Sequence, residues 1–390
     1  MLSHLYMKIR VAVYTLRNCR LSVVGIMARE RVLDDIVTGF MLNTCRLRPQ
    51  PSNHGVIAAL LYGQIARYDS DDGEVVPLIT GSAAEFYIEP MLPLVNDVDV
   101  MYHLNTQLVI PEGHPPPTQL PDEFRSRVDV YQINNSQINS EIINVPGYVY
   151  LKARYLLREC SDYGNYKAVE CHGTDKYIGN SALRNTNPRE IHGPAAYFTT
   201  ENVKIPSRDE VPCLRCLLWP LQAADWPTRH RNYGWPDSGT LVRVVSNGCD
   251  VVAVAHRQCR QHKWMSKVQW RLSFSRAEIV LINRWMPVQQ IVYHMLRYFR
   301  KIERVTDCAD NSRKSTLSNY HIKTLMLWAC ELKPNSWWTD DVNLVKMCVQ
   351  LLHILAELLT DARCQHYFIH RHRSSVNFGR GKTFLPENYV

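Results

Sequence analysis

Helical spacing marks both ends of the chain, and strand-like stretches fill its middle. From residue 29 to residue 46, apolar side chains recur every three or four positions, which predicts an amphipathic helix. The segment Val56–Arg67 has the same spacing and is also predicted to be helical. We expect the first of these helices to brace the core of the domain that follows.

Stretches rich in β-branched and aromatic residues predict a sheet between residues 98 and 275. The longest is Val98–Ile110, and the prolines over 111–121 predict a loop after it, because proline removes a backbone donor. Residues 161–192 are rich in Asn, Gly, Asp and Lys and are predicted to be irregular. Shorter fragments are predicted over 128–133 and 148–156, as strand or helix, and over 194–200, 209–218, 240–245, 250–255 and 268–275, as strands.

The helical spacing of apolar residues returns after Ser275. It predicts three helices, over 288–299, 318–331 and 341–359. No unit repeats internally with the period of a solenoid. We therefore expect a helical lobe in the C-terminal third, packed on a lobe that contains the sheet.

The composition is that of an ordinary globular protein. Its 390 residues are 46% hydrophobic and 21% charged, which excludes collagen-like, low-complexity and wholly disordered chains. Their number suggests two domains, or one large core with a smaller lobe. No uncharged stretch approaches the ~20 residues of a membrane helix, so no membrane partner is expected. The formal charge of +8 is compatible with an anionic partner if the cations are clustered.

The twelve cysteines are scattered through apolar stretches, which is typical of reduced thiols that fill a core. We therefore expect a cytoplasmic protein, with the nucleus as the alternative. Cys213 and Cys216 have the spacing of half a zinc site but lie in a strand-like run, so we expect buried thiols. Near the C-terminus the surrounding arginines favour a basic surface tail over a metal site at Cys364, His366, His370 and His372.

Residues 1–28 are interpreted as a basic extension. The first 29 residues contain five Lys or Arg and no acid. A transit peptide, a basic arm for an anion, and an extension upstream of a second start at Met27 are the three interpretations. We favour the last, because the helical spacing begins only afterwards.

Asp97 and Asp99 are the first candidates for chemistry. They are two positions apart in a strand-like sequence, so their side chains are expected on one face, where a divalent cation such as Mg²⁺ would offset their repulsion. Upstream, Gly81 and Ser82 form a small-residue turn that can approach a triphosphate. Together these features favour a nucleotidyltransferase core, with two solvated aspartates on an edge strand as the alternative.

Several strings of residues carry a resemblance to a known family. GSAAEF, from Gly81, and NDVDVMY, from Asn96, resemble the catalytic region of cyclic GMP-AMP synthase-like receptors. The male-abnormal-twenty-one domain, to which these receptors belong, has signature strings similar to WRLSFSRAE at 270–278 and LSNYHIKTLMLWACE at 317–331. Further similar strings are HGPAAYF at 192–198 and VPCLRCLLWP at 211–220.

The resemblance runs from about residue 57 to residue 359 and implies an α+β fold: a bilobal nucleotidyltransferase core with a mixed twisted sheet plus a C-terminal helical-bundle lobe. Residues 29–285 would form the core with its N-terminal bracing helix. Residues 286–390 would form the helical lobe and a basic tail.

The resemblance also implies an activity. The family joins two ribonucleoside triphosphates into a cyclic dinucleotide by two-metal catalysis, with two Mg²⁺ or Mn²⁺ ions, usually after double-stranded nucleic acid or another foreign ligand binds. By position, Asp97, Asp99 and Asp209 match the catalytic, metal-binding acids, and Glu210 would point to the opposite face of its strand. The alternatives are a catalytically silent scaffold of the same family and a nucleotidyltransferase with linear products.

Nucleotide contacts are implied in the same way. Besides Gly81 and Ser82, the matching positions are Arg271 and Ser273 for a base or phosphate, Tyr320 for base stacking, Lys323 for phosphate, and Arg297, where the family usually has lysine. Without the resemblance, Tyr320 would be interpreted as a core tyrosine, and Arg297 and Lys323 as charges on a solvated helix face.

One departure from the family bears on the activating ligand. The zinc-binding insertion of vertebrate cyclic GMP-AMP synthase has no counterpart, because residues 282–291 contain neither Cys nor His. No structural zinc is expected, and double-stranded RNA or another ligand is favoured over DNA. Basic clusters over 256–267, 297–304 and 363–373 would bind phosphates without sequence preference if they share a face.

Overall fold

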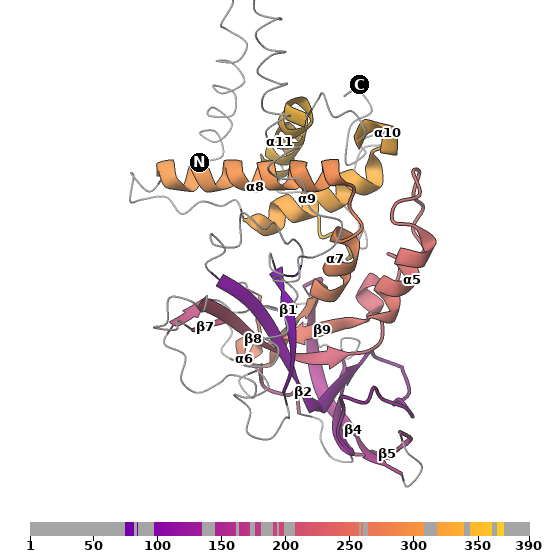
Figure 1. Ribbon diagram of the computed structural model, residues 1–390. Coiled ribbons are helices and arrows are strands. Elements are labelled where there is room, and N and C mark those ends of the chain that lie inside the picture. The colour runs from indigo at the N-terminus through magenta and orange to yellow at the C-terminus, as the bar shows by residue number, and fades with distance from the viewer. Residues whose placement is uncertain are drawn as a thin grey trace, which may run out of the picture.

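A computed structural model shows a twisted sheet in the lower part of the molecule and helices above it (Figure 1). The upper helices are α8 (Pro287–Asp307), α9 (Asn319–Leu332) and α11 (Leu344–Thr360). The helices predicted over 29–46 and 56–67 lie outside the described residues. The structure describes residues 75–81, 84, 97–134, 145–160, 164–171, 176–180, 190–192, 195–198, 207–256, 259, 264–307, 318–338, 344–360 and 365–369.

The sheet has ten strands and is mixed, as predicted. The strands are β1 (Val75–Thr80), β2 (Asp97–Ile110), β3 (Arg127–Ile133), β4 (Tyr148–Glu159), β5 (Tyr166–Glu170), β6 (Glu190–His192), β7 (Ala195–Phe198), β8 (Ser207–Cys216), β9 (Cys249–Val252) and β10 (Gln269–Ser273). Their order is β1-β2-β3-β4-β10-β9-β8-β7-β6, with β5 added on β4. A further parallel pairing of β2 with β8 closes the path of strands on itself.

Two predictions about the sheet region are wrong. The strand predicted over 240–245 is the helix α5 (Ser238–Ser246). Its valines favour strands, but the carboxylate of Asp237 caps the helix, because it accepts hydrogen bonds from the Thr240 N–H and hydroxyl at 2.9 and 2.6 Å. The stretch predicted to be irregular over 161–192 contains β5 and β6, and buried Tyr166 anchors β5 through its hydroxyl, which donates to the Arg125 carbonyl.

The three helices predicted after Ser275 are confirmed as α8, α9 and α11. A capping box begins α9: the Ser318 hydroxyl accepts from the His321 N–H, and His321 Nδ1 accepts from the Ser318 N–H at 3.0 Å. The remaining helices of the described part are the α-helices α6 (Met265–Val268), α7 (Ser275–Ile282) and α10 (Asn335–Trp338) and the 3-10 helix η3 (Leu221–Ala223). Within the described residues, no helix is both long and apolar enough to span a bilayer.

One hydrophobic core joins the sheet to the helices. Leu214 of β8, Leu281 of α7, Leu325 of α9 and Leu351 of α11 all belong to it, and each is at most 1% exposed. Burying a side chain of this size stabilises a fold by about 1.5–3 kcal/mol. The helices therefore pack against the sheet through a shared hydrophobic core.

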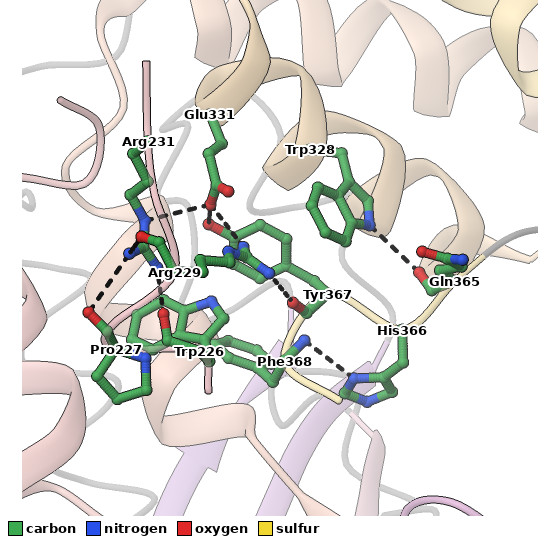
Figure 2. A network of polar contacts seen from close by, with 10 residues as sticks. All are labelled: Trp226, Pro227, Arg229, Arg231, Trp328, Glu331, Gln365, His366, Tyr367 and Phe368. Carbon is green, nitrogen blue, oxygen red and sulfur yellow. Dashed lines mark hydrogen bonds and ion pairs between the residues drawn. The ribbon is translucent and has the colours of Figure 1, made fainter. Parts of the chain in front are cut away.

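A buried ionic cluster joins α9 of the helical lobe to the segment that precedes α5 (Figure 2). The Glu331 carboxylate of α9 forms ion pairs with Arg229 and Arg231, and it accepts a hydrogen bond of 2.7 Å from the Tyr367 hydroxyl. The guanidinium of Arg229 also lies over the rings of Trp328 and Tyr367, 4.5 and 4.6 Å from their centroids. We call Arg229, Arg231, Glu331 and Tyr367 the Glu331 cluster.

The segment Gln365–Ile369, here called the strap, corrects the prediction of a basic surface tail over 363–373. Tyr367, Phe368 and Ile369 are each at most 5% exposed and belong to the main core. The arginines and histidines of this stretch predicted a surface tail, but its three consecutive apolar residues bury it in the core. Cys364, His370 and His372 lie outside the described residues.

Candidate functional site

Two carboxylates from distant parts of the chain meet on neighbouring strands. Asp99 of β2 and Asp209 of β8 are register partners in the parallel ladder. Such partners lie about 5 Å apart and point to the same face of a sheet. Both residues are only partly exposed. Two carboxylates this close repel each other, and a cation beside them would relieve the repulsion.

Gly81 lies directly against the Asp99 carboxylate. It follows β1, whose last residue, Thr80, is the register partner of Asp99. Its φ of +63° is in the left-handed region. A Cβ added at this position would lie 1.8 Å from Asp99 Oδ2. Only glycine fits here, because the Asp99 carboxylate occupies the place that a side chain would take. Ser82 lies outside the described residues.

The third predicted acid is described only through its backbone. Asp97 begins β2 opposite Ser207 of β8, and its side chain lies outside the described part of the chain. Within the described residues, no three His, Cys, Asp or Glu side chains gather as a metal site. The pair of Asp99 and Asp209 nevertheless fits Mg²⁺ or Mn²⁺, because these ions take carboxylate oxygens and the two residues are register partners on one face of the sheet.

Replacing Gly81 with alanine is expected to weaken Mn²⁺ binding by more than about tenfold, because the methyl group would displace the Asp99 carboxylate. The Mn²⁺-induced rise in melting temperature measures this binding. Gly164→Ala is the matched control: Gly164 has a φ of +79° and nothing within 4 Å of an added Cβ. It should lose about 1 kcal/mol of stability from backbone strain and keep its response to Mn²⁺. Equal responses in both variants would contradict the assignment.

Ser273 of β10 faces the same side of the sheet as the carboxylates. Its hydroxyl lies 3.8 Å from the sulfur of Met101 and 3.1 Å from the Ser275 hydroxyl. Met101 follows Asp99 by two positions on β2, so both side chains are on one face. This contact brings the predicted nucleotide-binding serine to the face that Asp99 and Asp209 share.

A second group of polar side chains gathers where β10, α7 and α9 meet. Lys323 Nζ of α9 lies 2.8 Å from Glu278 Oε2 of α7, and this ion pair is largely buried. Tyr320, one turn before Lys323, interacts electrostatically with Glu278 and with Arg271 of β10. We call Arg271, Glu278, Tyr320 and Lys323 the Lys323 group; three of its members were predicted as nucleotide contacts.

Tyr320 is partly exposed, although its hydroxyl group is desolvated. Its residue is 43% exposed, and desolvation of its hydroxyl, followed by the charge of Glu278, raises the pKa of Tyr320 above its usual value. Arg271 and Lys323 act in the opposite direction. The hydroxyl therefore stays protonated, while a large part of the residue is open to solvent.

The structure does not bring Arg297 into the Lys323 group. In the contacts of the described residues, its guanidinium lies over the ring of Tyr293 at 5.5 Å, one turn earlier on α8. Burial and then the charge of Arg297 lower the pKa of the neighbouring His294 to about 3. The contacts of Arg297 therefore support a role within α8, and its predicted contact with a nucleotide stays a prediction.

Glu278 and His366 were not predicted as nucleotide-binding residues. Glu278 was visible, since it ends the string WRLSFSRAE, but its pairing with Lys323 depends on how α7 packs on α9. The ring of His366 lies 6.0 Å from that of Tyr320. Its proximity could not be foreseen once the strap had been interpreted as a tail.

The prediction of buried thiols at Cys213 and Cys216 is confirmed. Both are free cysteines of β8 and at most 2% exposed. Burial raises the pKa of Cys213 well above its usual value, and the nearby Asp250 carboxylate adds to this effect. A protonated, buried thiol is a packing group and not a nucleophile.

Two family models match the chain. Residues 167–284 match the Mab-21 protein nucleotidyltransferase domain, and residues 289–373 match the Mab-21 protein HhH/H2TH-like domain. Together these ranges cover just over half of the chain. The chain belongs to the Mab-21 family. Its Mab-21 nucleotidyltransferase domain contains Asp209, Arg271, Ser273 and Glu278, and the C-terminal Mab-21 domain contains the rest of the Lys323 group and the strap.

A curated relative is the Drosophila melanogaster protein named "Protein mab-21-like", which is 27% identical over 180 residues. The match covers 44% of this chain and 46% of the relative, so the chain spans about half the length of the relative that it matches. Membership of the Mab-21 family confirms the predicted α+β fold with a C-terminal helical lobe. The boundary between the nucleotidyltransferase core and the helical lobe, placed between residues 285 and 286, stays a prediction.

Proposed function

We propose that this Mab-21 protein is a metal-dependent enzyme that joins two ribonucleoside triphosphates into a cyclic dinucleotide second messenger. Double-stranded RNA or another foreign ligand activates it in innate immune sensing. The observation that carries the proposal is the pairing of Asp99 with Asp209 in register, with Gly81 against the carboxylate. A scaffold protein has no use for two adjacent carboxylates that repel each other.

The residues of the site fit the parts of such a reaction. A ribose hydroxyl oxygen attacks the α-phosphorus of the second nucleotide, a P–O bond forms, the bond to pyrophosphate breaks, and the hydroxyl proton leaves to solvent. Asp99 and Asp209 would hold Mg²⁺ or Mn²⁺, which supply charge neutralisation for the attacking and leaving oxygens. Arg271 and Lys323 offer cations to the phosphates, and Tyr320 offers a stacking surface to a base.

Glu278 gives Lys323 a fixed position. The 2.8 Å ion pair holds the ammonium group in a site where the lysine is largely buried. An ammonium group that is already placed loses less side-chain entropy when a phosphate arrives. The carboxylate also repels a phosphate that approaches on its own side, so the pair restricts where a triphosphate can lie.

The compartment that we propose is the cytoplasm, with the nucleus as the alternative. The cysteines of the described part are free thiols, and six of them are buried: Cys213, Cys216, Cys249, Cys259, Cys330 and Cys348. Reduced thiols of this kind are usual in reducing compartments. Ribonucleoside triphosphates and foreign RNA are both accessible there.

Incubation of the purified protein with labelled ribonucleoside triphosphates and Mg²⁺ or Mn²⁺ tests the proposal. Double-stranded RNA, double-stranded DNA or no nucleic acid is added in parallel. We expect a phosphatase-resistant product that Asp99→Asn abolishes and that the exposed Asp129→Asn retains. If the protein yields no product and also shows no metal-dependent binding of triphosphate, the enzyme interpretation is wrong, and a silent Mab-21 scaffold takes its place.

A further inference from the structure

The strap is held rigidly on both sides of His366 (Figure 2). The indole N–H of Trp328 donates to the Gln365 carbonyl at 3.3 Å, and Arg229 donates to the Tyr367 carbonyl at 2.9 Å. Phe368 stacks on Phe274, the residue that links β10 to α7, with centroids 4.7 Å apart. The strap therefore connects the Glu331 cluster to the beginning of α7, which carries Glu278.

The imidazole of His366 has one defined tautomer. Its Nδ1 accepts hydrogen bonds from the N–H groups of Phe368 and Ile369, at 3.1 and 3.3 Å. A neutral imidazole that accepts at Nδ1 carries its proton on Nε2. Burial, with a contribution from Arg271, lowers the pKa of His366 to about 4 against the opposing charge of Glu278. At neutral pH the ring is thus uncharged and can donate only from Nε2.

The ring of His366 lies at the edge of the Lys323 group. It is 6.0 Å from the ring of Tyr320 and 5.4 Å from that of Phe274. Glu278 and Arg271 are both close enough to influence its charge. Within the described part of the chain, Nε2 has no hydrogen-bond partner, although Nδ1 has two.

We propose that His366 is a base-recognition residue, whose Nε2–H donates a hydrogen bond to an acceptor atom on the nucleobase that stacks on Tyr320. This inference rests on the proposed nucleotide site. A neutral donor among aromatic rings suits the edge of a base, whereas the charged Arg271 and Lys323 suit phosphates. The Glu331 cluster has a role here, because it fixes the strap and so holds the donor in place before the nucleotide binds.

Two substitutions at residue 366 separate the donor from the ring. His366→Asn keeps an acceptor for the strap N–H groups and a side-chain donor, but has no ring. His366→Phe keeps an aromatic ring and has neither acceptor nor donor. A packing role predicts that the phenylalanine variant performs better, whereas base recognition predicts that the asparagine variant does.

Calorimetric titration with α,β-methylene analogues of ATP, GTP, UTP and CTP in Mn²⁺ measures the effect without turnover. Inorganic tripolyphosphate is the base-free probe. We expect His366→Phe to bind at least one nucleotide about three- to tenfold more weakly and tripolyphosphate unchanged, since one hydrogen bond is lost. His366→Asn should stay within about twofold of the unaltered protein. If His366→Phe fails to fold, His366→Ser replaces it, because its hydroxyl accepts from the strap but is too short to reach a base.

The titrations distinguish a failure of the proposed nucleotide site from a failure of the role proposed for His366. If the unaltered protein binds no nucleotide analogue with Mn²⁺, the proposed function fails and the inference fails with it. If the unaltered protein binds them and His366→Phe or His366→Ser binds them equally well, only the role of His366 is wrong. An equal loss of nucleotide and tripolyphosphate binding also overturns the inference, because it points to a distorted phosphate site.

Discussion

Replacing Asp209 with asparagine is expected to lower nucleotidyl transfer by more than about a hundredfold while the protein stays folded. Asp209 is the register partner of Asp99, so the substitution removes one of two carboxylates that would hold a metal ion. Even the residues that only orient metal ligands cost about 10–100-fold when they are replaced, and a ligand itself costs more. Product formation from labelled triphosphates, beside the Asp129→Asn control, measures the loss.

The stability of the same variant separates a metal site from a structural role. The neutral amide that replaces the Asp209 carboxylate would not repel Asp99, so without metal the melting temperature of Asp209→Asn should equal or exceed that of the unaltered protein. Mn²⁺ should then raise the melting temperature of the unaltered protein only, because a bound ligand stabilises the folded state that binds it. A lower melting temperature without metal, together with an intact Mn²⁺ response, would contradict the assignment.

Replacing Glu331 with glutamine is expected to lower the free energy of unfolding by about 3–5 kcal/mol, which is the cost of breaking a buried ion pair from one side. Side chains in the cluster are strongly desolvated: Glu331 is 4% exposed and Arg229 11%. Burial lowers the pKa of Arg231, although the carboxylate of Glu331 acts against this. A neutral amide would leave two buried guanidinium groups without a counter-charge. Urea unfolding measures the loss.

Glu170→Gln is the matched control for this prediction. Glu170 forms an ion pair of 2.7 Å with Arg154, but the two side chains are 39% and 47% exposed. Exposed pairs of this kind contribute about 0–1 kcal/mol. Comparable losses in Glu331→Gln and Glu170→Gln would show that the Glu331 cluster is not a buried fastening of the helical lobe.

Periodicity within each segment predicted much of the fold. The three C-terminal helices follow from the spacing of apolar residues, and the strand from residue 98 follows from its richness in β-forming residues. The same reasoning failed at α5, because it counted the β-branched residues Val242, Val244 and Val245 and overlooked the cap at Asp237. The composition of this segment is compatible with a helix or a strand, and the cap at Asp237 stabilises the helix.

The site was predictable in its residues but not in its geometry. Asp99 and Asp209 are 110 positions apart, and no local pattern says that β2 and β8 pair in register. The approach of Gly81 to Asp99 depends on the same strand pairing. Glu278 and His366 emerged only when α7, α9 and the strap were packed together. Long-range register and packing are properties of the whole chain, so a search for local motifs does not find them.

The most direct test of the central claim, that Asp99 and Asp209 together hold a catalytic divalent ion, is an anomalous difference map from crystals grown with Mn²⁺ and an α,β-methylene triphosphate. We expect a manganese peak about 2.1–2.3 Å from a carboxylate oxygen of each residue, beside Gly81. The peak should be absent from crystals of Asp209→Asn. A triphosphate bound elsewhere, or well-ordered Asp99 and Asp209 carboxylates with no manganese between them, would contradict it.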